Sequence, residues 1–186
     1  MTARQITPAQ TAGPFLHIGM LWPDGPTAVA EDHPDAIVLT GQIVDGADDV
    51  VADALVETWQ ADGEGRFASD GDPRGRAASG FRGWARCATD DDGCWRIVTV
   101  KPGAVPGPDG TIQAPHIDCT IHARGLLRHL FTRVYFADEH EANAGDPVLA
   151  GLPEERRATL LATATGRVYE LDIRLQGDRA TVFFDA

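Results

Sequence analysis

Residues 114–123 read APHIDCTIHA, and this stretch carries the pattern that decides the fold. Apolar and polar residues alternate along it, so a β-strand would place Ile117 and Cys119 on one face and His116 and Asp118 on the other. An alternation with a period of two residues is typical of a half-buried strand. We therefore expect a strand here, with two polar side chains next to each other on one face.

Segments of this kind recur at short intervals along the rest of the chain. Turn sequences separate most of them, such as Asp45-Gly46 and residues 176–178, the latter expected to close a C-terminal hairpin. Many short strands joined by such turns are typical of an all-β fold, and we predict an antiparallel β-sandwich. The expected strands cover residues 37–44, 54–60, 84–89, 95–101, 116–123, 130–137, 167–175 and 179–184.

Four segments depart from the strand pattern. Residues 153–165 begin with a proline followed by acidic residues, which predicts one short accessory helix. Residues 7–19 contain two prolines and no consistent period, which predicts an extended or irregular arm. Residues 67–82 and 102–115 are expected to form long loops between strands.

The composition limits both the domain count and the partners. A chain of 186 residues fits one domain, with an N-terminal arm and loop over residues 1–36 and the β-sandwich over residues 37–186. Lys and Arg number 16 against 28 Asp and Glu, and the resulting net charge of −12 would repel nucleic acid and anionic lipid. We therefore expect neither nucleic acid nor a membrane among the partners.

The cysteines and the N-terminal residues indicate the compartment. Residues 1–19 contain no apolar segment of the kind found in signal peptides, and no apolar run approaches the length of a membrane span. Cys87, Cys94 and Cys119 are an odd number without CxxC spacing, so we expect free buried thiols and no disulfide framework. Both observations favour a cytoplasmic protein.

The polar face of residues 114–123 is a first candidate site. His116 and Asp118 could supply two ligands of the 2-His-1-carboxylate site that Fe(II) oxygenases use. Such a site needs a second histidine, and the chain after this strand offers only His129 and His140. The residues alone therefore favour polar side chains on a solvent or interface face over an Fe(II) site.

Arg133 is a second candidate. It lies in LFTRVYF, where it shares a strand face with Phe131 and Tyr135, and a guanidinium beside aromatic rings could bind a carboxylate through two hydrogen bonds. The alternative is an arginine on a wet strand face. The sequence contains no nucleophile elbow, P-loop, dinucleotide fingerprint, HExxH or EF-hand pattern, so it indicates no self-contained active site.

Six segments carry a resemblance that covers nearly the whole chain. They are TPAQTAGPFLHIG (7–19), ALVETWQADGEGRF (54–67), VKPG (100–103), APHIDC (114–119), HLFTRVYFADE (129–139) and YELDIRLQGDRATVFFD (169–185). Together they resemble the intradiol dioxygenases, which implies a β-sandwich of the intradiol dioxygenase type. QTAGP, ARGLL and the VFFD ending look specifically like the α subunit of hetero-oligomeric members, in which a β subunit carries the iron.

The resemblance also shows which metal ligands this chain has lost. In the iron-bearing subunit two tyrosines and two histidines hold Fe(III). At the matching positions here, Val105 replaces one tyrosine, His116 is kept and Asp118 replaces the second histidine. The loop over residues 67–82 has no tyrosine, and Gln113 stands about where the β subunit has an arginine. The resemblance therefore implies that Fe(III) is held by the partner β subunit and not by this chain, with Val105, His116 and Asp118 as vestigial positions.

The same resemblance implies a role at the partner's site. Thr11, Pro14 and Arg133 match the family positions that line the substrate pocket over the β-subunit iron. The implied substrates are 3,4-dihydroxybenzoate, a small aromatic acid, and O2, and the implied product is 3-carboxy-cis,cis-muconate. None of the catalytic residues would come from this chain, which would orient the substrate and exclude water.

Two other functions stay open on the sequence alone. The chain could be a free-standing binding or scaffold domain without a catalytic partner, and a co-purifying chain with the tyrosine and histidine ligands would argue against this. It could also be an Fe(II) oxygenase that uses His116 and Asp118, which stoichiometric metal in the isolated chain would favour.

Overall fold

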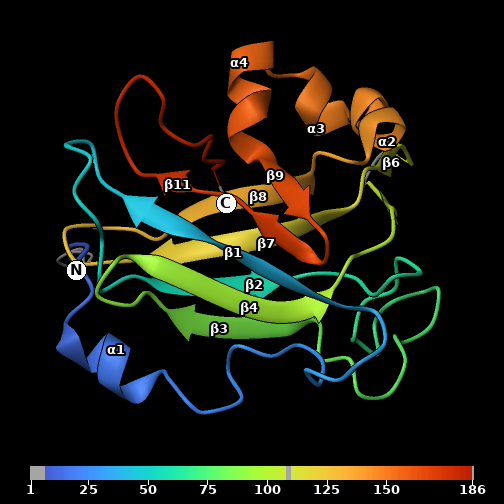
Figure 1. Cartoon of the computed structure of the whole chain (residues 1–186), viewed down its shortest axis with the longest axis horizontal. Coiled ribbons are helices and arrows are strands. Elements are labelled where there is room, and N and C mark those ends of the chain that lie inside the picture. Colours follow the sequence, from blue (N-terminus) through green and yellow to red (C-terminus); the bar gives the residue numbers. More distant parts are fainter. Residues whose placement is uncertain (1–6, 108–109, 186) are drawn as a thin grey trace, which may run out of the picture.

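The computed structural model describes residues 7–107 and 110–185, and strands dominate this part of the chain (Figure 1). The long strands lie where the alternating patterns predict them. The strands are β1 Ala36–Val44, β2 Leu55–Trp59, β3 Trp84–Ala88, β4 Cys94–Val100, β5 Val105–Pro106, β6 Ile112–Gln113, β7 His116–His122, β8 Leu130–Phe136, β9 Leu161–Thr165, β10 Val168–Glu170 and β11 Ile173–Arg174. The helices are α1 Pro14–Gly19, α2 His140–Gly145, α3 Pro147–Ala150, α4 Glu154–Arg157 and the 3-10 helix η1 Ala158–Leu160.

Nine of these strands form one folded sheet. Its order is β11-β1-β10-β9-β8-β7-β2-β3, with β4 paired to the other side of β1, and β5 and β6 form a separate pair. The predicted antiparallel β-sandwich is confirmed only in part: the chain is mostly strands and most neighbours are antiparallel, but β1 pairs in parallel with β10 and β11, and β8 with β9. Parallel neighbours need a long crossover connection, and the segment with α2, α3 and α4 supplies one between β8 and β9.

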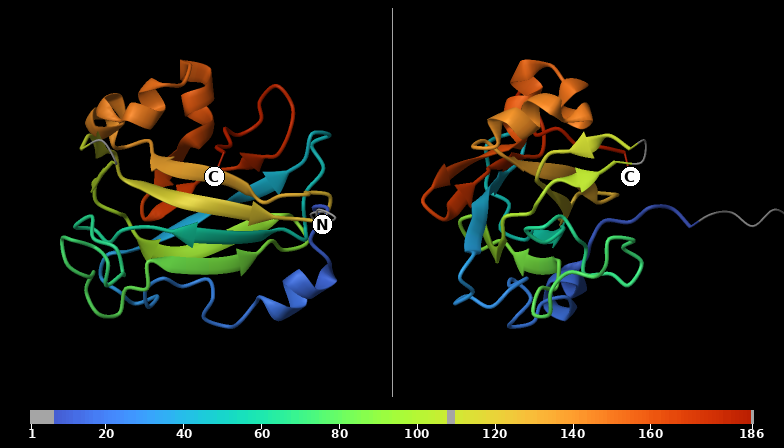
Figure 2. Two further views of the ribbon diagram at one scale, coloured as in Figure 1. Left: turned by 180° about the vertical axis from the view of Figure 1, so that it is seen from behind. Right: turned by 90° about the vertical axis from the view of Figure 1, so that its right-hand side faces the viewer.

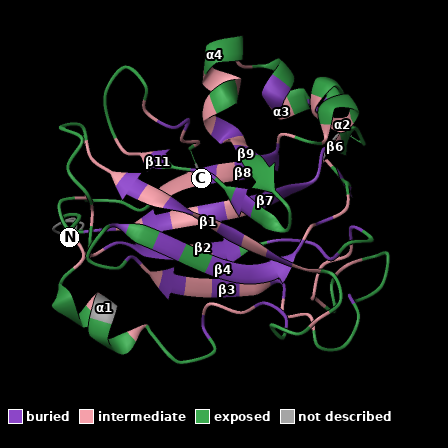
Figure 3. Ribbon diagram, in the orientation of Figure 1, coloured by how far each residue is buried: buried purple, intermediate pink, exposed green. Residues whose placement is uncertain are grey.

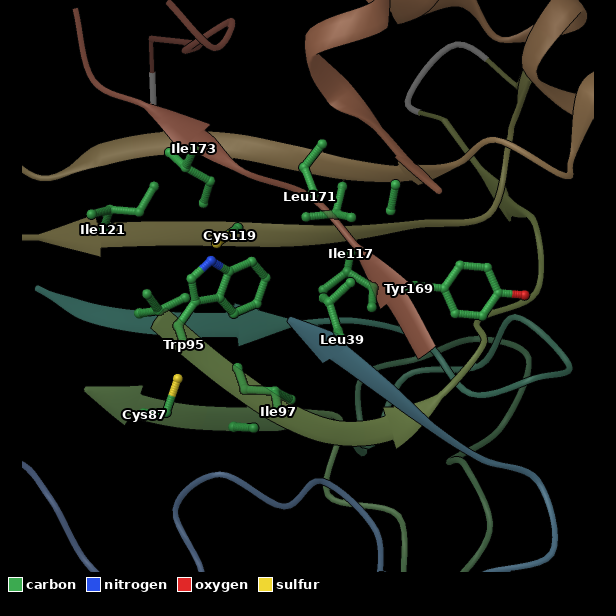
Figure 4. Close-up of a cluster of buried hydrophobic side chains, with 14 of the residues drawn as sticks. Leu39, Cys87, Trp95, Ile97, Ile117, Cys119, Ile121, Tyr169, Leu171 and Ile173 are labelled. Atoms are coloured by element: carbon green, nitrogen blue, oxygen red, sulfur yellow. The ribbon is translucent and has the colours of Figure 1, made fainter. Parts of the chain in front are cut away.

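The hydrophobic core lies between the two halves of the folded sheet. One cluster of buried side chains includes Leu39 and Trp95 from β1 and β4, and Ile117 and Cys119 from β7 (Figure 4). The alternation of buried and half-buried residues along β1 and β7 follows from this arrangement, because only one face of each strand meets the core. The outward face of β7 is therefore left for polar residues.

Residues 25–28 close the gap between the two edge strands β3 and β4. Arg86 of β3 donates its N–H to the carbonyl of Gly25 at 2.8 Å. Val98 of β4 donates to Pro26 at 2.9 Å and accepts from Ala28 at 2.8 Å. A side chain on Gly25 would place its Cβ 2.8 Å from the Arg86 carbonyl oxygen, so the close approach requires glycine. This segment makes the folded sheet nearly closed.

The prediction of one accessory helix is wrong in number and in extent. Within residues 153–165 the chain forms α4 and η1 and then enters β9, because that end pairs with β8 and β10. The segment predicted as an irregular arm contains the short helix α1. Figures 1 and 2 show α2–α4 beside β8 and β9, with α1 on the far side next to β3. None of the helices in the described residues is long and apolar enough to cross a bilayer.

The C-terminal part also differs from its prediction. The strand expected over residues 167–175 is divided into β10 and β11, because the side chain of Asp172 accepts the N–H of Gln42 in place of a strand partner. Within the described residues, the segment 179–184 forms no strand, and Phe184 makes an isolated bridge to Phe131. A C-terminal hairpin of two strands is therefore absent from the part of the chain that the structure describes.

Candidate functional site

Five polar or aromatic residues meet on the outward face of β7 and β8. In the register of these strands, His116 lies opposite Tyr135. Asp118 lies opposite Arg133, and Gln113 of β6 contacts the Arg133 side chain. We call these five residues the β7–β8 polar cluster. The sequence places His116 and Asp118 on one face, the pairing of β7 with β8 adds Arg133 and Tyr135, and Gln113 joins through its contact with Arg133.

The guanidinium of Arg133 lies at the centre of the cluster. Its Nε is 3.0 Å from Oδ1 of Asp118, and the two side chains are only 17% and 27% exposed, so solvent screens this ion pair weakly. The contact is not an aligned hydrogen bond, since Oδ1 is buried without a hydrogen-bond partner of good geometry. Nη1 is 3.4 Å from both the Gln113 Oε1 and the Tyr135 hydroxyl. Arg133 is thus held on two sides.

His116 is buried and neutral at physiological pH. Its Nδ1 lies 2.7 Å from the carbonyl oxygen of Ala114, which can only accept, so Nδ1 carries the proton. Burial, and then the positive charge of Arg133, lower the pKa of His116 below its ordinary value. The other ring nitrogen, Nε2, is 3.9 Å from Asp118. His116 therefore presents a neutral imidazole to the cluster.

The buried side chain of Asp146 connects the cluster to the neighbouring segments through hydrogen bonds. Its carboxylate is fully buried and accepts the N–H of Ala114 at 2.8 Å and those of Val148 and Leu149 at 2.9 Å. The hydroxyl of Tyr135 donates to the same carboxylate at 3.3 Å. Asp146 was not among the residues predicted from the sequence. Asp146-Pro147 is a typical helix start, but it does not indicate that the carboxylate also reaches Ala114, directly after β6, and Tyr135 of β8.

The residues of the cluster do not fit an Fe(III) site. Val105 lies buried in β5 and has no donor atom. Within residues 7–107 and 110–185 no three His, Cys, Asp or Glu side chains come together in a way that could hold a metal ion. The positive charge next to His116 and Asp118 is the Arg133 guanidinium, which would repel a second cation. The lack of a third ligand among the described residues and the charge of Arg133 also argue against an Fe(II) site on His116 and Asp118.

Tyrosine supplies no phenolate here either. Burial raises the pKa of Tyr135 to about 12, so this phenol keeps its proton at neutral pH. The loop over residues 67–82, which contains no tyrosine, places Phe67 flat against Trp59 with ring centroids 5.9 Å apart. Neither Val105 nor the loop over residues 67–82 thus supplies a phenolate, and Tyr135 stays protonated, whereas a hard Fe(III) ion favours anionic oxygen ligands such as phenolate.

Thr11 and Pro14 lie away from Arg133 within this chain. The Thr11 hydroxyl accepts the N–H of Gly125 at 2.7 Å, beyond the C-terminal end of β7. Pro14 is the exposed first residue of α1. Arg133 pairs with the middle of β7, at least about 13 Å of strand away. The three residues predicted to bind substrate are therefore not brought together by this chain alone.

A second group of charged residues anchors the N-terminal segment to the sheet. The Arg86 guanidinium pairs with Glu57 and lies over the rings of Trp22 and Trp84, 5.0 and 4.8 Å from their centroids. A hydrogen bond to His122 is the main cause that lowers the pKa of Glu57; burial opposes it and Arg86 adds to it. These contacts hold the segment after α1 on β3, and Figure 3 shows α1 itself as largely exposed.

The cysteines are only partly as predicted. All three are free, and Cys87 and Cys119 are buried, but Cys94 is exposed. Cys94 lies at the start of β4, where alternate side chains point to solvent. Burial raises the pKa of the Cys87 thiol to about 11, so this group is unreactive at neutral pH.

Comparisons with known proteins agree on one family. A family model described as Dioxygenase, that of the intradiol dioxygenases, matches residues 24–177. The chain is 46% identical over its full length to the full-length protocatechuate 3,4-dioxygenase alpha chain of Burkholderia cepacia. It is 42% identical to the Pseudomonas putida alpha chain over 96% of both chains. The beta chain of Burkholderia cepacia is 35% identical, over 79% of this chain and 67% of that one.

Solved structures show the same fold at lower identity. Catechol 1,2-dioxygenase from Acinetobacter sp. ADP1 superposes with a TM-score of 0.63 at 20% identity, covering 80% of this chain and 55% of that chain. The dioxygenase domain of a carbohydrate-binding fusion protein from Streptomyces sp. SirexAA-E gives a TM-score of 0.60 at 22% identity, covering 91% and 99% of the two chains. These similarities concern the fold alone.

Proposed function

This chain belongs to the intradiol dioxygenase family, and we propose that it acts as the α-type subunit of a protocatechuate 3,4-dioxygenase. In this proposal a β subunit holds the Fe(III), and the present chain completes the substrate pocket. The reaction is the intradiol cleavage of 3,4-dihydroxybenzoate by O2 to 3-carboxy-cis,cis-muconate. The full-length identity to two alpha chains and the additional match to a beta chain support the pairing.

The assignment of iron to the β subunit and of substrate recognition to this chain rests on the residues at and around the β7–β8 polar cluster. Valine stands at one ligand position, and the carboxylate of Asp118 is paired with a guanidinium. A site built in this way binds an anion better than it binds a metal ion. The iron and its chemistry therefore belong to the partner subunit, and this chain supplies substrate recognition and scaffold.

Arg133, Thr11 and Pro14 are the residues we assign to substrate binding. The substrate has a carboxylate that needs a cation or donor and a ring that needs an apolar wall. Arg133 provides a positive charge in an otherwise acidic protein, and Thr11 and Pro14 lie in an exposed arm that can reach a neighbouring subunit. Their separation within one chain agrees with a pocket that is complete only in the assembly.

Several finer features belong to the same proposal. We expect the nearly closed sheet to correspond to the β-sandwich of the family, with residues 1–36 as arm and loop and residues 37–186 as the sandwich domain. We also expect the assembly to work in the cytoplasm, where three free cysteines would stay reduced.

Co-expression tests the proposal. The chain should co-purify with a β subunit that carries the tyrosine and histidine ligands, and the pair should consume O2 when 3,4-dihydroxybenzoate is added. The β subunit alone and this chain alone are the controls and should show at most residual activity. Full activity of the β subunit without this chain would refute the proposed contribution.

A further inference from the structure

We infer that Tyr135 and Asp146 position Arg133 for the substrate carboxylate, an inference that rests on the substrate-binding role proposed above for Arg133. Both residues are fully buried, so we assign them a positioning role and no direct contact with the substrate. They act through hydrogen bonds that fix which guanidinium nitrogens are occupied and which one remains available.

The hydrogen bonds between these residues have a fixed direction. The Asp146 carboxylate can only accept, so the Tyr135 hydroxyl must donate to it at 3.3 Å. A phenol has one proton, and its oxygen is therefore left to accept from Nη1 of Arg133 at 3.4 Å. The result is a relay from Arg133 to Tyr135 to Asp146 that cannot reverse while the carboxylate is ionised. Tyr135 is fully buried in β8, so water does not compete for these contacts.

Asp146 also fixes the second acceptor of Nη1. Its carboxylate holds the N–H of Ala114, and the preceding residue, Gln113, accepts from Nη1 at 3.4 Å. The same carboxylate accepts two N–H groups of α3, so the helix, the residue after β6 and Tyr135 of β8 are all hydrogen-bonded to one buried group. A shift of Asp146 would therefore move both acceptors of Arg133 together.

The arrangement leaves one nitrogen of Arg133 available. Nε pairs with Asp118 at 3.0 Å, and Nη1 is occupied by Gln113 and Tyr135. Within residues 7–107 and 110–185, no hydrogen bond or ion pair involves Nη2. An arginine binds a carboxylate best when its planar guanidinium is already oriented. Tyr135 and Asp146 provide this orientation before the substrate arrives.

The test replaces the Tyr135 hydroxyl in the assembled enzyme of this chain and its β subunit. Tyr135→Phe keeps the ring in place and removes both hydrogen bonds of the relay. We expect the KM for 3,4-dihydroxybenzoate to rise about threefold to tenfold, with kcat changed less than about twofold. The inhibition constant of neutral 3,4-dihydroxybenzamide, which has no carboxylate, should not change.

A matched control distinguishes the loss of Arg133 positioning from the general effect of removing a tyrosine hydroxyl that donates to a carboxylate. The hydroxyl of Tyr169 donates to Asp138 at 2.9 Å on a strand that does not contact Arg133, so Tyr169→Phe should leave the KM unchanged. Gln113→Met removes the other acceptor of Nη1 at a half-buried position. It should raise the KM in the same carboxylate-dependent way, even if Tyr135→Phe fails to assemble.

The outcomes distinguish this inference from the proposed function. If Arg133→Ala raises the KM but Tyr135→Phe and Gln113→Met do not, the positioning role is wrong and the substrate-binding role stands. If the neutral amide loses affinity as much as the acid does, the effect is structural and the inference fails. If Arg133→Ala leaves the KM for 3,4-dihydroxybenzoate unchanged, Arg133 does not bind the substrate, and both the proposed role of Arg133 and this inference are wrong.

Discussion

At the scale of single residues, Gly41 of β1 packs directly against the backbone of Leu171, between β10 and β11. A Cβ at this position in β1 would lie 1.9 Å from the carbonyl oxygen of Leu171, which is backbone and cannot rotate away. Gly41→Ala should therefore lower the free energy of unfolding by about 3 kcal/mol, measured by urea denaturation. Gly145→Ala is the control, because a Cβ there meets nothing within 4 Å. Equal stability of the two variants would contradict this packing.

Arg133 is the residue on which substrate affinity should depend. Arg133→Ala in the assembled enzyme should raise the KM for 3,4-dihydroxybenzoate about tenfold to a hundredfold, with a smaller effect on kcat, because a charged hydrogen bond to the carboxylate is lost. Arg96→Ala removes a strand arginine whose side chain is 54% exposed and should have no effect on steady-state kinetics. Unchanged kinetics in Arg133→Ala would refute the assignment.

Glu57 should make stability depend on pH. Its pKa is lower in the folded chain than the ordinary value of 4.5. A depressed carboxyl pKa contributes stability that is complete above the unfolded pKa and is lost as the pH falls through the folded pKa. Glu57→Gln should therefore lower the free energy of unfolding by about 1–2 kcal/mol at pH 7, and the difference from wild type should shrink below about pH 4.5.

Thermal or urea unfolding between pH 7 and pH 3 measures this difference. The exposed Glu155 gives the matched control, since Glu155→Gln removes a carboxylate outside the contacts of Arg86 and His122. A stability difference for Glu57→Gln that stays constant down to pH 3 would show that the carboxylate charge is not what stabilises the fold.

At the scale of elements, residues 25–28 should behave as a strand although they belong to none. The amides of Arg86 and Val98 donate to the carbonyls of Gly25 and Pro26 in this segment, and the amide of Ala28 donates to the carbonyl of Val98 in β4. Hydrogen exchange followed by NMR should show these three amides protected to nearly the same degree as those inside β1. Exchange as fast as in the exposed loop residues 69–75 would mean that the sheet is open at this edge.

The strands that face the core on one side could be predicted from the sequence. β1 and β7 alternate between buried and more exposed residues as their sequences indicate. The segment of β9, LATAT, could not be predicted, because alanine and leucine favour a helix locally and only the long-range pairing with β8 and β10 makes it a strand. Parallel pairing is likewise invisible in a local pattern.

The candidate site could be predicted in part. Strand periodicity places His116 and Asp118 together, and the resemblance identifies Arg133. Their contact depends on the register of β7 with β8, which no local pattern contains. Asp146 lies 28 positions after Asp118 in the chain and reaches the cluster only through the crossover segment. The contribution of this residue had to come from the structure.

At the scale of the whole molecule, the residues that we propose bind substrate are divided between two regions of the chain. The β7–β8 polar cluster lies in the sheet beside β6, and the arm with Thr11 and Pro14 docks beyond the other end of β7. Within residues 7–107 and 110–185, no three His, Cys, Asp or Glu side chains come together in a way that could hold a metal ion. This agrees with the proposal that the chain supplies recognition residues and that a partner subunit supplies the iron.

We propose that this chain binds no iron of its own and works with an iron-bearing partner. The most direct measurement is the iron content and visible spectrum of the chain purified alone and of the chain co-purified with its β subunit. We predict iron and a tyrosinate-to-iron charge-transfer band in the pair, and neither in the lone chain. Stoichiometric iron with that band in the lone chain would contradict the account.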